Sequence, residues 1–453
     1  ALVAVVLIIT DSLQAIHIIP FIFALISLWL AYLFYTRRLP LPDIEAAKAW
    51  PYLLLALFGL HHLIVQYAGL PMTEMPFICL TLGGVVWLDR LKDRPQESTL
   101  RWSSGMAVLI AAACMFRSVG YMFIPAAVGW LWMSGHRAKA GATLGLTALL
   151  LSPWLWFQSR CCGGLFGAGY QADIEGAGQT NWPLLFRPVE NFIVYATELL
   201  PETMCPFLGD RINLLFASVS LGFVPEFFGL LITAAVIAGA LIYTRRRSDP
   251  AAWICLGITA ALLLWPYRYT RFVLPILPML SLYALQAGRR IFQSRPRWLY
   301  AIAAVFIAGF VLRDAHMMVQ PPRANYPDYR AQAQFVAQNT PGDAVVFAKN
   351  APGLGLYVDR GFVAHKTPAQ SPSHRRVVEQ LPDRPLYLLI CADRSRGRFE
   401  GVLKHPASRQ VAEDDGLDCR LYDVSDVPAS SFEERPGSAV ASVLSRSDAA
   451  QRS

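Results

Sequence analysis

The sequence predicts a polytopic α-helical membrane protein that ends in a small C-terminal α/β soluble domain. Of its 453 residues, 55% are hydrophobic and only 16% are charged, and the mean hydropathy is +0.38. These values are too apolar for a soluble protein of this length. The apolar residues are clustered in runs such as 21–35 and 227–243, which is typical of helices that satisfy their backbone hydrogen bonds inside a bilayer.

About ten apolar segments within residues 1–313 form the predicted transmembrane bundle. They are expected at 15–36, 50–68, 74–90, 103–117, 118–134, 141–158, 224–244, 251–266, 271–288 and 298–313. Several are short for a spanning helix, and the stretches 70–77 and 117–125 predict helices broken near a cavity. Residues 1–10 are already apolar and carry no initiator Met or charged flank, so we expect the true N-terminus to be missing.

Basic residues predict the orientation, because cytoplasmic loops of membrane proteins are enriched in lysine and arginine. They gather in alternate short connections: Arg37, Arg38, Lys48; Arg90, Lys92, Arg94, Arg101; Arg137, Lys139; Arg245, Arg246, Arg247; Arg289, Arg290, Arg295, Arg297. The long loop 159–223 contains more carboxylates than arginines. The sequence therefore predicts that this loop and the C-terminus lie outside the cytoplasm.

The segment 314–424 has the pattern of an extracytoplasmic α/β domain. An amphipathic helix is expected at 329–339, followed by a Pro-Gly-Asp turn and strands at 344–347, 386–391 and 419–424. The polar composition of 425–453 predicts a disordered tail. Among eight cysteines, Cys391 and Cys419 are the pair best placed for a disulfide, although spacing alone leaves that pairing open.

Several classes of function lack support. The basic residues lie in short loops rather than on one amphipathic face, which argues against nucleic-acid binding. The cysteines have no metal-ligand spacing, and nucleotide-binding, nucleophile-elbow and zinc-protease motifs are absent from the sequence. No cofactor is predicted, and a requirement for a divalent metal stays open.

The candidate site residues are ionisable residues near the ends of apolar segments. Burying such residues in a membrane is costly, so those that are present there are candidates for a function. Glu74 follows Thr73, a suitable N-cap, in the first turn of a predicted helix. Its carboxylate could bind a cation or a sugar hydroxyl, or act as a general base. A purely structural carboxylate at the helix dipole is an equally good interpretation.

Three arginines complete the candidate set. Arg117 lies between two apolar runs, and we expect it to pair with a carboxylate such as Glu74 or with a lipid phosphate. Arg268 and Arg271 lie among aromatic residues in a proline-rich stretch and could clamp a lipid phosphate. The alternative is an aromatic belt with arginines that extend to the membrane surface.

Weaker candidates for substrate contact are His62, Tyr67 and, in the long loop, Tyr170. A two-histidine metal site at His61 and His62 is disfavoured, because adjacent residues of one helix do not share a face. We also expect a helix from 188 to 200 within the long loop.

The order of several motifs resembles the GT-C membrane glycosyltransferases, in particular the family 39-like branch of protein O-mannosyltransferases and lipid A aminoarabinose transferases. The similarity covers about residues 10–425. The motifs are Tyr35-Thr-Arg-Arg38, Thr73-Glu-Met-Pro-Phe77, Phe116-Arg-Ser-Val-Gly120, Ser152-Pro-Trp154, Arg268-Tyr-Thr-Arg-Phe-Val-Leu-Pro-Ile-Leu-Pro278 and Asn339-Thr-Pro-Gly-Asp343.

The resemblance implies transfer of a sugar, with inversion, from a polyprenyl-phosphate donor to a lipid, glycan or protein acceptor outside the cytoplasm. It also implies a multi-pass protein of the bacterial inner membrane. It implies that the main catalytic base lies in a first outer loop that would precede Ala1. Glu74 matches a second acidic position, and Arg117, Arg268 and Arg271 match ligands of the donor phosphate. Apolar grooves between spans would hold the isoprenoid tail.

Two other functions remain open from the sequence. A transporter or flippase for a lipid-linked or anionic solute could use the same arginines, but such folds usually contain inverted repeats, which this sequence lacks. A non-catalytic assembly protein could use the terminal domain to bind a partner. The sequence identifies neither the sugar nor the acceptor.

Overall fold

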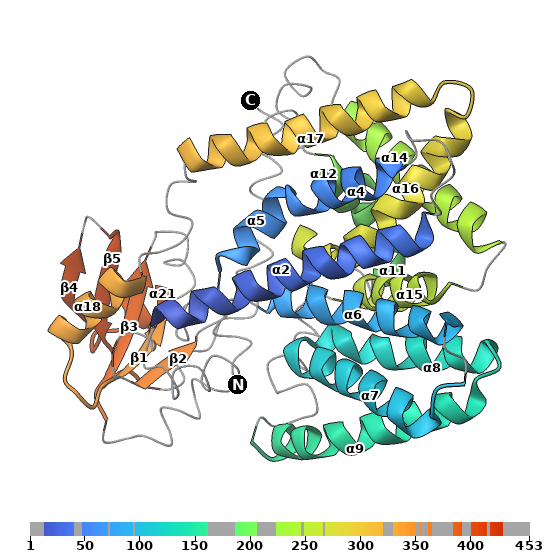
Figure 1. The fold of residues 1–453 in the computed structure, drawn as a ribbon. Coiled ribbons are helices and arrows are strands. Elements are labelled where there is room, and N and C mark those ends of the chain that lie inside the picture. Colours follow the sequence, from blue (N-terminus) through green and yellow to red (C-terminus); the bar gives the residue numbers. More distant parts are fainter. Residues whose placement is uncertain are drawn as a thin grey trace. The chain divides into compact units, whose positions relative to one another are not determined.

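The structure is a computed structural model in which the chain forms two compact units, Ala1–Val319 and Gln320–Ser453. It describes residues 13–39, 48–70, 73–93, 96–161, 186–205, 223–245, 249–265, 268–319, 329–348, 354, 358, 361–364, 384–391, 400–414 and 417–428. The first unit is helical and the second is built on a β-sheet (Figure 1). Residues 1–12 and most of the predicted tail lie outside the described ranges.

The helices of the first unit follow the predicted spans closely. They are α2 (Leu13–Arg38), α4 (Trp50–Gly59), α5 (His62–Ala68), α6 (Glu74–Asp93), α7 (Thr99–Phe116), η1 (Ser118–Met122), α8 (Phe123–Met133), α9 (Arg137–Cys161), α11 (Arg187–Val194), η2 (Tyr195–Leu199), α12 (Leu200–Met204), α14 (Phe223–Thr244), α15 (Pro250–Leu264), η3 (Thr270–Phe272), η4 (Leu274–Ile276), α16 (Leu277–Ile291) and α17 (Pro296–Val319). Each of the ten expected segments is helical.

Within the described residues, six helices are long and apolar enough to cross a membrane on their own, so the protein is a multi-pass membrane protein. The six are Ile18–Arg38, Thr99–Phe116, Arg137–Arg160, Glu226–Thr244, Thr270–Ile291 and Pro296–His316. The expected continuous span 50–68 is wrong in detail, because α4 and α5 meet at a 57° bend. The helices expected at 118–134 and 251–266 are shorter than a full span.

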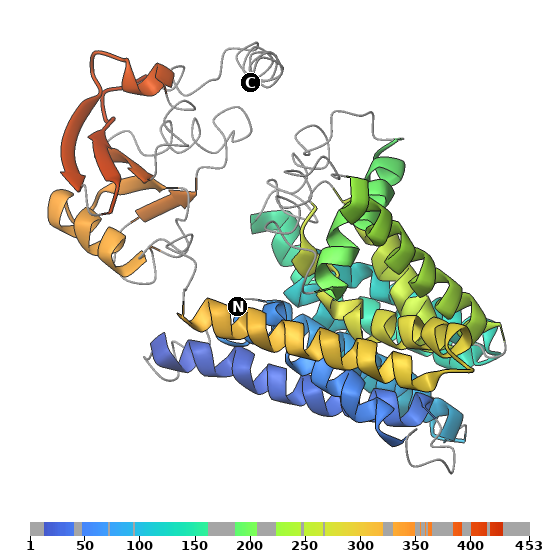
Figure 2. The same ribbon diagram turned by 90° about the horizontal axis from the view of Figure 1, so that it is seen from above.

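The helices pack closely where glycine removes a side chain. Helix α14 lies against α16, and α7 packs between α6 and α9 (Figures 1 and 2). A Cβ atom at Gly239 of α14 would lie 1.8 Å from the carbonyl oxygen of Tyr283 in α16. Only glycine therefore allows this approach of the two helix backbones.

A buried ionic cluster joins four helices at the end of the bundle opposite Glu74. Arg38 of α2 donates two hydrogen bonds to Asp89 of α6, and its Nη2 lies 2.7 Å from Asp249 Oδ1 at the start of α15. The hydroxyl of Tyr283 in α16 donates to Asp249 Oδ2 at 3.3 Å. All three charged side chains are buried. Arg38 was expected among the basic loop residues, and it is instead a buried counter-ion.

The second unit contains a five-stranded mixed sheet of order β2-β1-β3-β5-β4. Its elements are α18 (Tyr329–Asn339), β1 (Val345–Ala348), β2 (Gly361–Ala364), β3 (Leu386–Cys391), α21 (Glu400–Leu403), β4 (Arg409–Asp414) and β5 (Cys419–Asp423). Strand β1 is parallel to β2 and β3, whereas β5 is antiparallel to β3 and β4. Helix α18 covers one face (Figure 2), and Val402 of α21 packs on the other.

The small α/β unit agrees with the sequence in its helix and in three strands, whereas β2 and β4 were not expected. Cys391 and Cys419 face each other on β3 and β5 and form a disulfide. The folded part extends into the expected tail: Ser425 Oγ accepts a hydrogen bond from Leu386 N, and Val427 is buried. Residues 429–453 lie outside the described residues.

Candidate functional site

Glu74 is a buried carboxylate at the first residue of helix α6. Thr73 precedes the helix, and its carbonyl accepts the backbone N–H of Phe77 at 3.1 Å. The Glu74 side chain is only 5% exposed. A carboxylate buried to this extent in a membrane protein needs a positive partner, and the structure provides two.

Arg117 is the first partner, and a break in the chain places it there. Helix α7 ends at Phe116 because Arg117 has an extended backbone, and the chain then folds back in turn η1. A Cβ atom at Gly120 would lie 2.5 Å from the carbonyl oxygen of Ala113, so the tight turn requires glycine. Arg117 Nη1 donates to Glu74 Oε1 at 2.9 Å. The break at this position was predicted from the sequence.

Arg271 is the second partner and the more accessible one. Its Nε lies 3.7 Å from Glu74 Oε1, and its side chain is 34% exposed, against 15% for Arg117. Prolines at 275 and 278 delay the start of α16 and leave Arg271 on the short turn η3. The ring of Phe272 lies within 5.5 Å of both guanidinium carbons, a distance suited to cation–π attraction.

Arg268 belongs to a different arrangement. Its Nη2 lies 2.6 Å from Glu190 Oε1, and its Nε donates to Asn191 Oδ1 at 2.7 Å. Both partners are on helix α11. The structure therefore brings Arg117 and Arg271 together on Glu74, and it holds Arg268 on another pair of residues. The prediction from the sequence treats all three arginines as ligands of one phosphate.

Asn191 fixes the position of helix α11 on the bundle. It is fully buried, and its Nδ2 lies 2.8 to 3.3 Å from the carbonyl oxygens of Leu262, Leu263 and Trp265. These carbonyls are at the C-terminal end of α15, where a helix lacks its own donors. One side chain thus caps α15 and orients the guanidinium of Arg268.

Helix α11 turns its polar face inward. Arg187 and Asn191 are buried, while Val189, Phe192 and Ile193 are about half exposed. The expected helix 188–200 exists, as α11 followed by the π-helical turn η2, but its outward face is apolar rather than polar. Such a face is suited to the lipid interface. Burial raises the pKa of Tyr195 in η2, so its hydroxyl stays protonated and able to donate.

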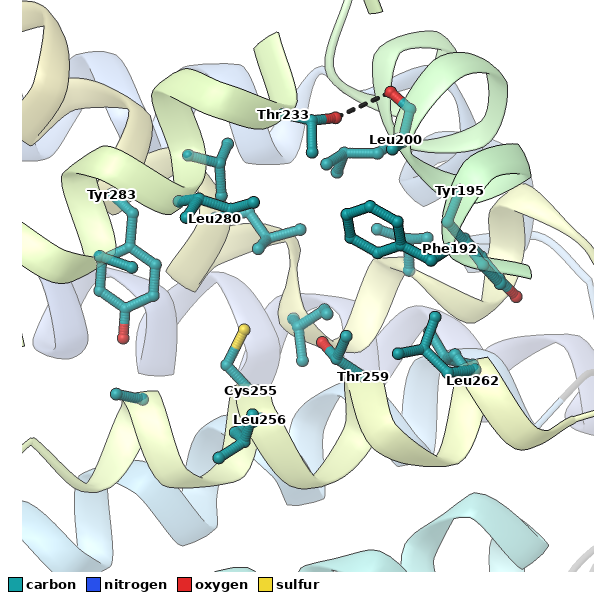
Figure 3. Close-up of a pocket in the computed structure, with 18 of the residues that line it drawn as sticks. Phe192, Tyr195, Leu200, Thr233, Cys255, Leu256, Thr259, Leu262, Leu280 and Tyr283 are labelled. Carbon is teal, nitrogen blue, oxygen red and sulfur yellow. Dashed lines mark hydrogen bonds between the residues drawn. The ribbon is translucent and has the colours of Figure 1, made fainter. Parts of the chain in front are cut away.

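An apolar cavity of about 430 Å³ opens beside these residues, within the size range of ligand sites. It runs along α15, with Phe192 and Tyr195 near one end and Tyr283 near the other (Figure 3). Helix α14 forms another wall, where Thr233 Oγ1 donates to the carbonyl oxygen of Ala196 at 2.8 Å. Leu262 and Leu263, which Asn191 caps, also line the cavity. Asn191, which holds Arg268, is therefore bonded to residues that line the cavity.

The remaining candidates lie elsewhere. His62 is buried with its ring stacked on His61 at 4.7 Å and near Phe310 of α17. The expectation that the two rings cannot share a face is wrong, because the helix breaks before His61. Tyr67 packs at the edge of the bundle core. Tyr170 lies outside the described residues.

The described part of the chain contains no group of three or more histidine, cysteine or acidic residues arranged to hold a metal. His61 is also fully engaged: its Nε2 lies 2.6 Å from the carbonyl oxygen of Thr203, and its Nδ1 accepts from Leu63 N. Both histidine rings also pack near Phe310 of α17.

Glu190 and Asn191 were not among the sequence-derived site residues. A signal for them was present, because residues 187, 190 and 191 follow the spacing of one helix face. The apolar residues of the same helix make its opposite face hydrophobic. That pattern predicts a buried polar face only if the helix is already placed at the lipid interface.

These helices, with an acid and arginines brought together in the bundle, define a multi-pass membrane protein, as the sequence predicted. The fold is similar to that of apo ArnT from Cupriavidus metallidurans, with a TM-score of 0.52 and 12% identity, over 92% of this chain and 84% of ArnT. No protein-family model and no curated protein sequence matches the chain.

Two further solved structures match with lower TM-scores. ArnT from the same organism bound to undecaprenyl phosphate has a TM-score of 0.47 at 12% identity, over 91% of this chain and 84% of ArnT. The archaeal oligosaccharyltransferase AglB from Archaeoglobus fulgidus, in complex with an inhibitory peptide and a dolichol-phosphate, has a TM-score of 0.46 at 12% identity, over 83% of this chain and 58% of AglB.

Proposed function

We propose that the protein is an integral membrane glycosyltransferase that moves a sugar from a polyprenyl-phosphate donor to an acceptor outside the cytoplasm. The observation that carries this proposal is the pairing of two arginines, Arg117 and Arg271, with the single carboxylate of Glu74. The three groups together have a surplus positive charge. An anion such as a phosphate would neutralise that charge in a region of low dielectric constant.

The donor is an amphiphile, and the site has a matching apolar part. Val273 and Ile276 line the apolar cavity and lie a few residues after Arg271 in the same segment. A phosphate on Arg271 or Arg268 would therefore have its isoprenoid tail within reach of the cavity. Undecaprenyl phosphate, which the second ArnT structure contains, is the first ligand to test.

In the proposed reaction, an acceptor hydroxyl attacks the anomeric carbon of the sugar. The bond between that carbon and the phosphate oxygen breaks, polyprenyl phosphate leaves with the bonding electrons, and a carboxylate base takes the hydroxyl proton. Fixed guanidinium groups stabilise the charge that develops on the leaving phosphate.

Glu74 fits the role of a positioning residue. Its Oε1 accepts the hydrogen bond of Arg117 and faces Arg271, so it holds two cations in place. Arg271, the more exposed of the two arginines on Glu74, would touch the donor phosphate, and Arg268, three residues earlier in the chain, would be its second contact. His62, Tyr67 and Tyr170 stay predictions as substrate contacts.

The proposed orientation follows from the basic loop residues, which predict that the Glu74 end of the bundle and the C-terminal α/β unit lie outside the cytoplasm. A bacterial inner membrane with the terminal unit in the periplasm fits this arrangement. A divalent metal is not part of the proposal.

The test uses the full chain in lipid nanodiscs. We expect saturable binding of undecaprenyl phosphate, transfer from at least one of a panel of sugar-labelled undecaprenyl-phosphate donors, and loss of both in Arg271→Ala. Arg297→Ala is the matched control, because Arg297 is an exposed arginine at the other end of the bundle. Equal binding by these two variants would contradict the proposed site, and absence of transfer from every donor would contradict the proposed reaction.

A further inference from the structure

Arg268 is held by two residues of helix α11 that differ in how firmly they are fixed. Asn191 is fully buried and bonded to three backbone carbonyls of α15 as well as to Arg268. It cannot move without uncapping that helix. Glu190 is different, because its side chain is 23% exposed.

The carboxylate of Glu190 is only partly satisfied. Its Oε1 lies 2.6 Å from Arg268 Nη2, whereas its Oε2 is buried and has no hydrogen-bond partner among the described residues. An unpaired buried carboxylate oxygen lowers the net stability of an ion pair. The contact between Glu190 and Arg268 is therefore easier to break than the contact between Asn191 and Arg268.

Arg268 itself needs an anion. Its side chain is 14% exposed, and a guanidinium buried to this degree is destabilised if it is left without a counter-charge. Because Asn191 is neutral, it can orient the guanidinium but cannot neutralise it. An empty site therefore requires a negative group that belongs to the protein.

We propose that Glu190 is an internal counter-ion that occupies the phosphate position on Arg268 in the empty site, and that the phosphate of the donor lipid displaces it. This inference rests on the proposed function and adds a residue that controls access to the same site. Asn191 keeps the guanidinium oriented during the exchange. The phosphodiester of the donor carries one negative charge, as the carboxylate does, and burial of its isoprenoid tail in the apolar cavity favours its replacement of Glu190 on the guanidinium.

The consequence is a specific effect on affinity. Glu190 competes with the phosphate, so it lowers the apparent affinity for every lipid phosphate and helps to expel the polyprenyl phosphate product. Removing the charge of Glu190 should then tighten binding. A purely structural ion pair would give the opposite result, because its loss would leave Arg268 misplaced.

The experiment measures the Kd and dissociation rate of undecaprenyl phosphate with the full chain in nanodiscs. We expect Glu190→Gln to bind about tenfold more tightly than wild type and to release the ligand more slowly. Glu190→Asp, which keeps the charge but shortens the side chain, should lie between the two. Glu198→Gln, an exposed acid of the adjoining turn η2, should bind as wild type does.

A double variant identifies the partner. In the background of Arg268→Ala, which should bind weakly, Glu190→Gln should have no further effect. Unchanged or weaker binding by both Glu190 variants, with wild-type binding intact, would overturn this inference and leave the proposed function in place. Failure of the wild type to bind undecaprenyl phosphate would overturn both.

Discussion

Arg117 Nη1 donates a 2.9 Å hydrogen bond to Glu74 Oε1, although the two residues lie 43 positions apart in the sequence. The contact joins the start of α6 to the break after α7. The side chains are 15% and 5% exposed, so the pair is largely shielded from water. Arg271 approaches the same carboxylate oxygen from a third segment. Glu74 therefore joins three places in the bundle: the start of α6, the break after α7 and the turn η3.

Glu74→Gln should destabilise the membrane unit, because it leaves two arginines without their carboxylate. Removing one partner of a buried ion pair costs about 3 kcal/mol, and Arg271→Ala should cost less because its side chain is 34% exposed. Thermal unfolding in detergent, followed by circular dichroism, measures the difference. Glu226→Gln, a neutralisation of an exposed acid, is the control. A melting temperature for Glu74→Gln equal to that of the control would refute the structural role.

Much of this fold was predictable because local signals and hydropathy agree. Each apolar run that is predicted in the membrane unit is helical in the structure. The predicted helix 329–339 matches α18 in both bounds. The pair of Glu74 with Arg117 was also foreseeable, because a lone intramembrane arginine needs an acid. These predictions depend only on which segments are buried in the membrane, and the amino-acid composition of a segment indicates that directly.

The rest depended on tertiary contacts that composition does not report. The bend before His61 places two histidine rings together. The run 50–68 contains Gly59 at the end of α4 but no proline near the bend, so the sequence does not predict so sharp a change of direction. The role of Glu190 depends on its contact with Arg268, which lies 78 positions away in the sequence. The sequence predicts that Arg38 is a cation in a cytoplasmic loop, whereas the structure buries it against Asp89 and Asp249.

Gly239→Ala should disrupt the packing of α14 on α16. The added Cβ would meet the carbonyl oxygen of Tyr283 at 1.8 Å, and a backbone atom cannot turn away as a side chain can. Gly145→Ala in α9 is the matched control, since nothing lies within 4 Å of its Cβ, and alanine should stabilise that helix by up to about 1 kcal/mol. Thermal unfolding of both variants tests this, and similar melting temperatures would contradict the close approach.

Arg38→Ala should lower stability by about 3 to 5 kcal/mol, because it leaves Asp89 and Asp249 buried without their cation. A triple variant that also carries Asp89→Asn and Asp249→Asn should recover most of the loss, since no unpaired charge remains. Denaturant unfolding of the three proteins measures the recovery. If the triple variant is less stable than Arg38→Ala alone, the cluster does not act as a charge-balanced unit.

Reduction of the disulfide between Cys391 and Cys419 should destabilise the α/β unit. The bond closes a loop with a sequence separation of 28, for which the chain-entropy model gives about 3.6 kcal/mol. Limited proteolysis of the full chain with and without reductant should show faster cleavage within 329–428 in the reduced protein. The variant with both cysteines changed to alanine should be insensitive to reductant. Equal cleavage rates for oxidised and reduced wild type would contradict the prediction.

Asn191→Ala should weaken two structures at once, because this side chain caps α15 and orients Arg268. Loss of a buried hydrogen-bonding group costs about 1 to 3 kcal/mol, and a freely rotating Arg268 should bind undecaprenyl phosphate less tightly. Asn191→Asp separates the effects: it retains the acceptor for Arg268 but places a negative charge against the carbonyls of Leu263 and Trp265. We expect this variant to be at least as destabilised as Asn191→Ala in thermal unfolding. An Asn191→Asp protein as stable as wild type would show that the amide donors do not hold helix α11 in place.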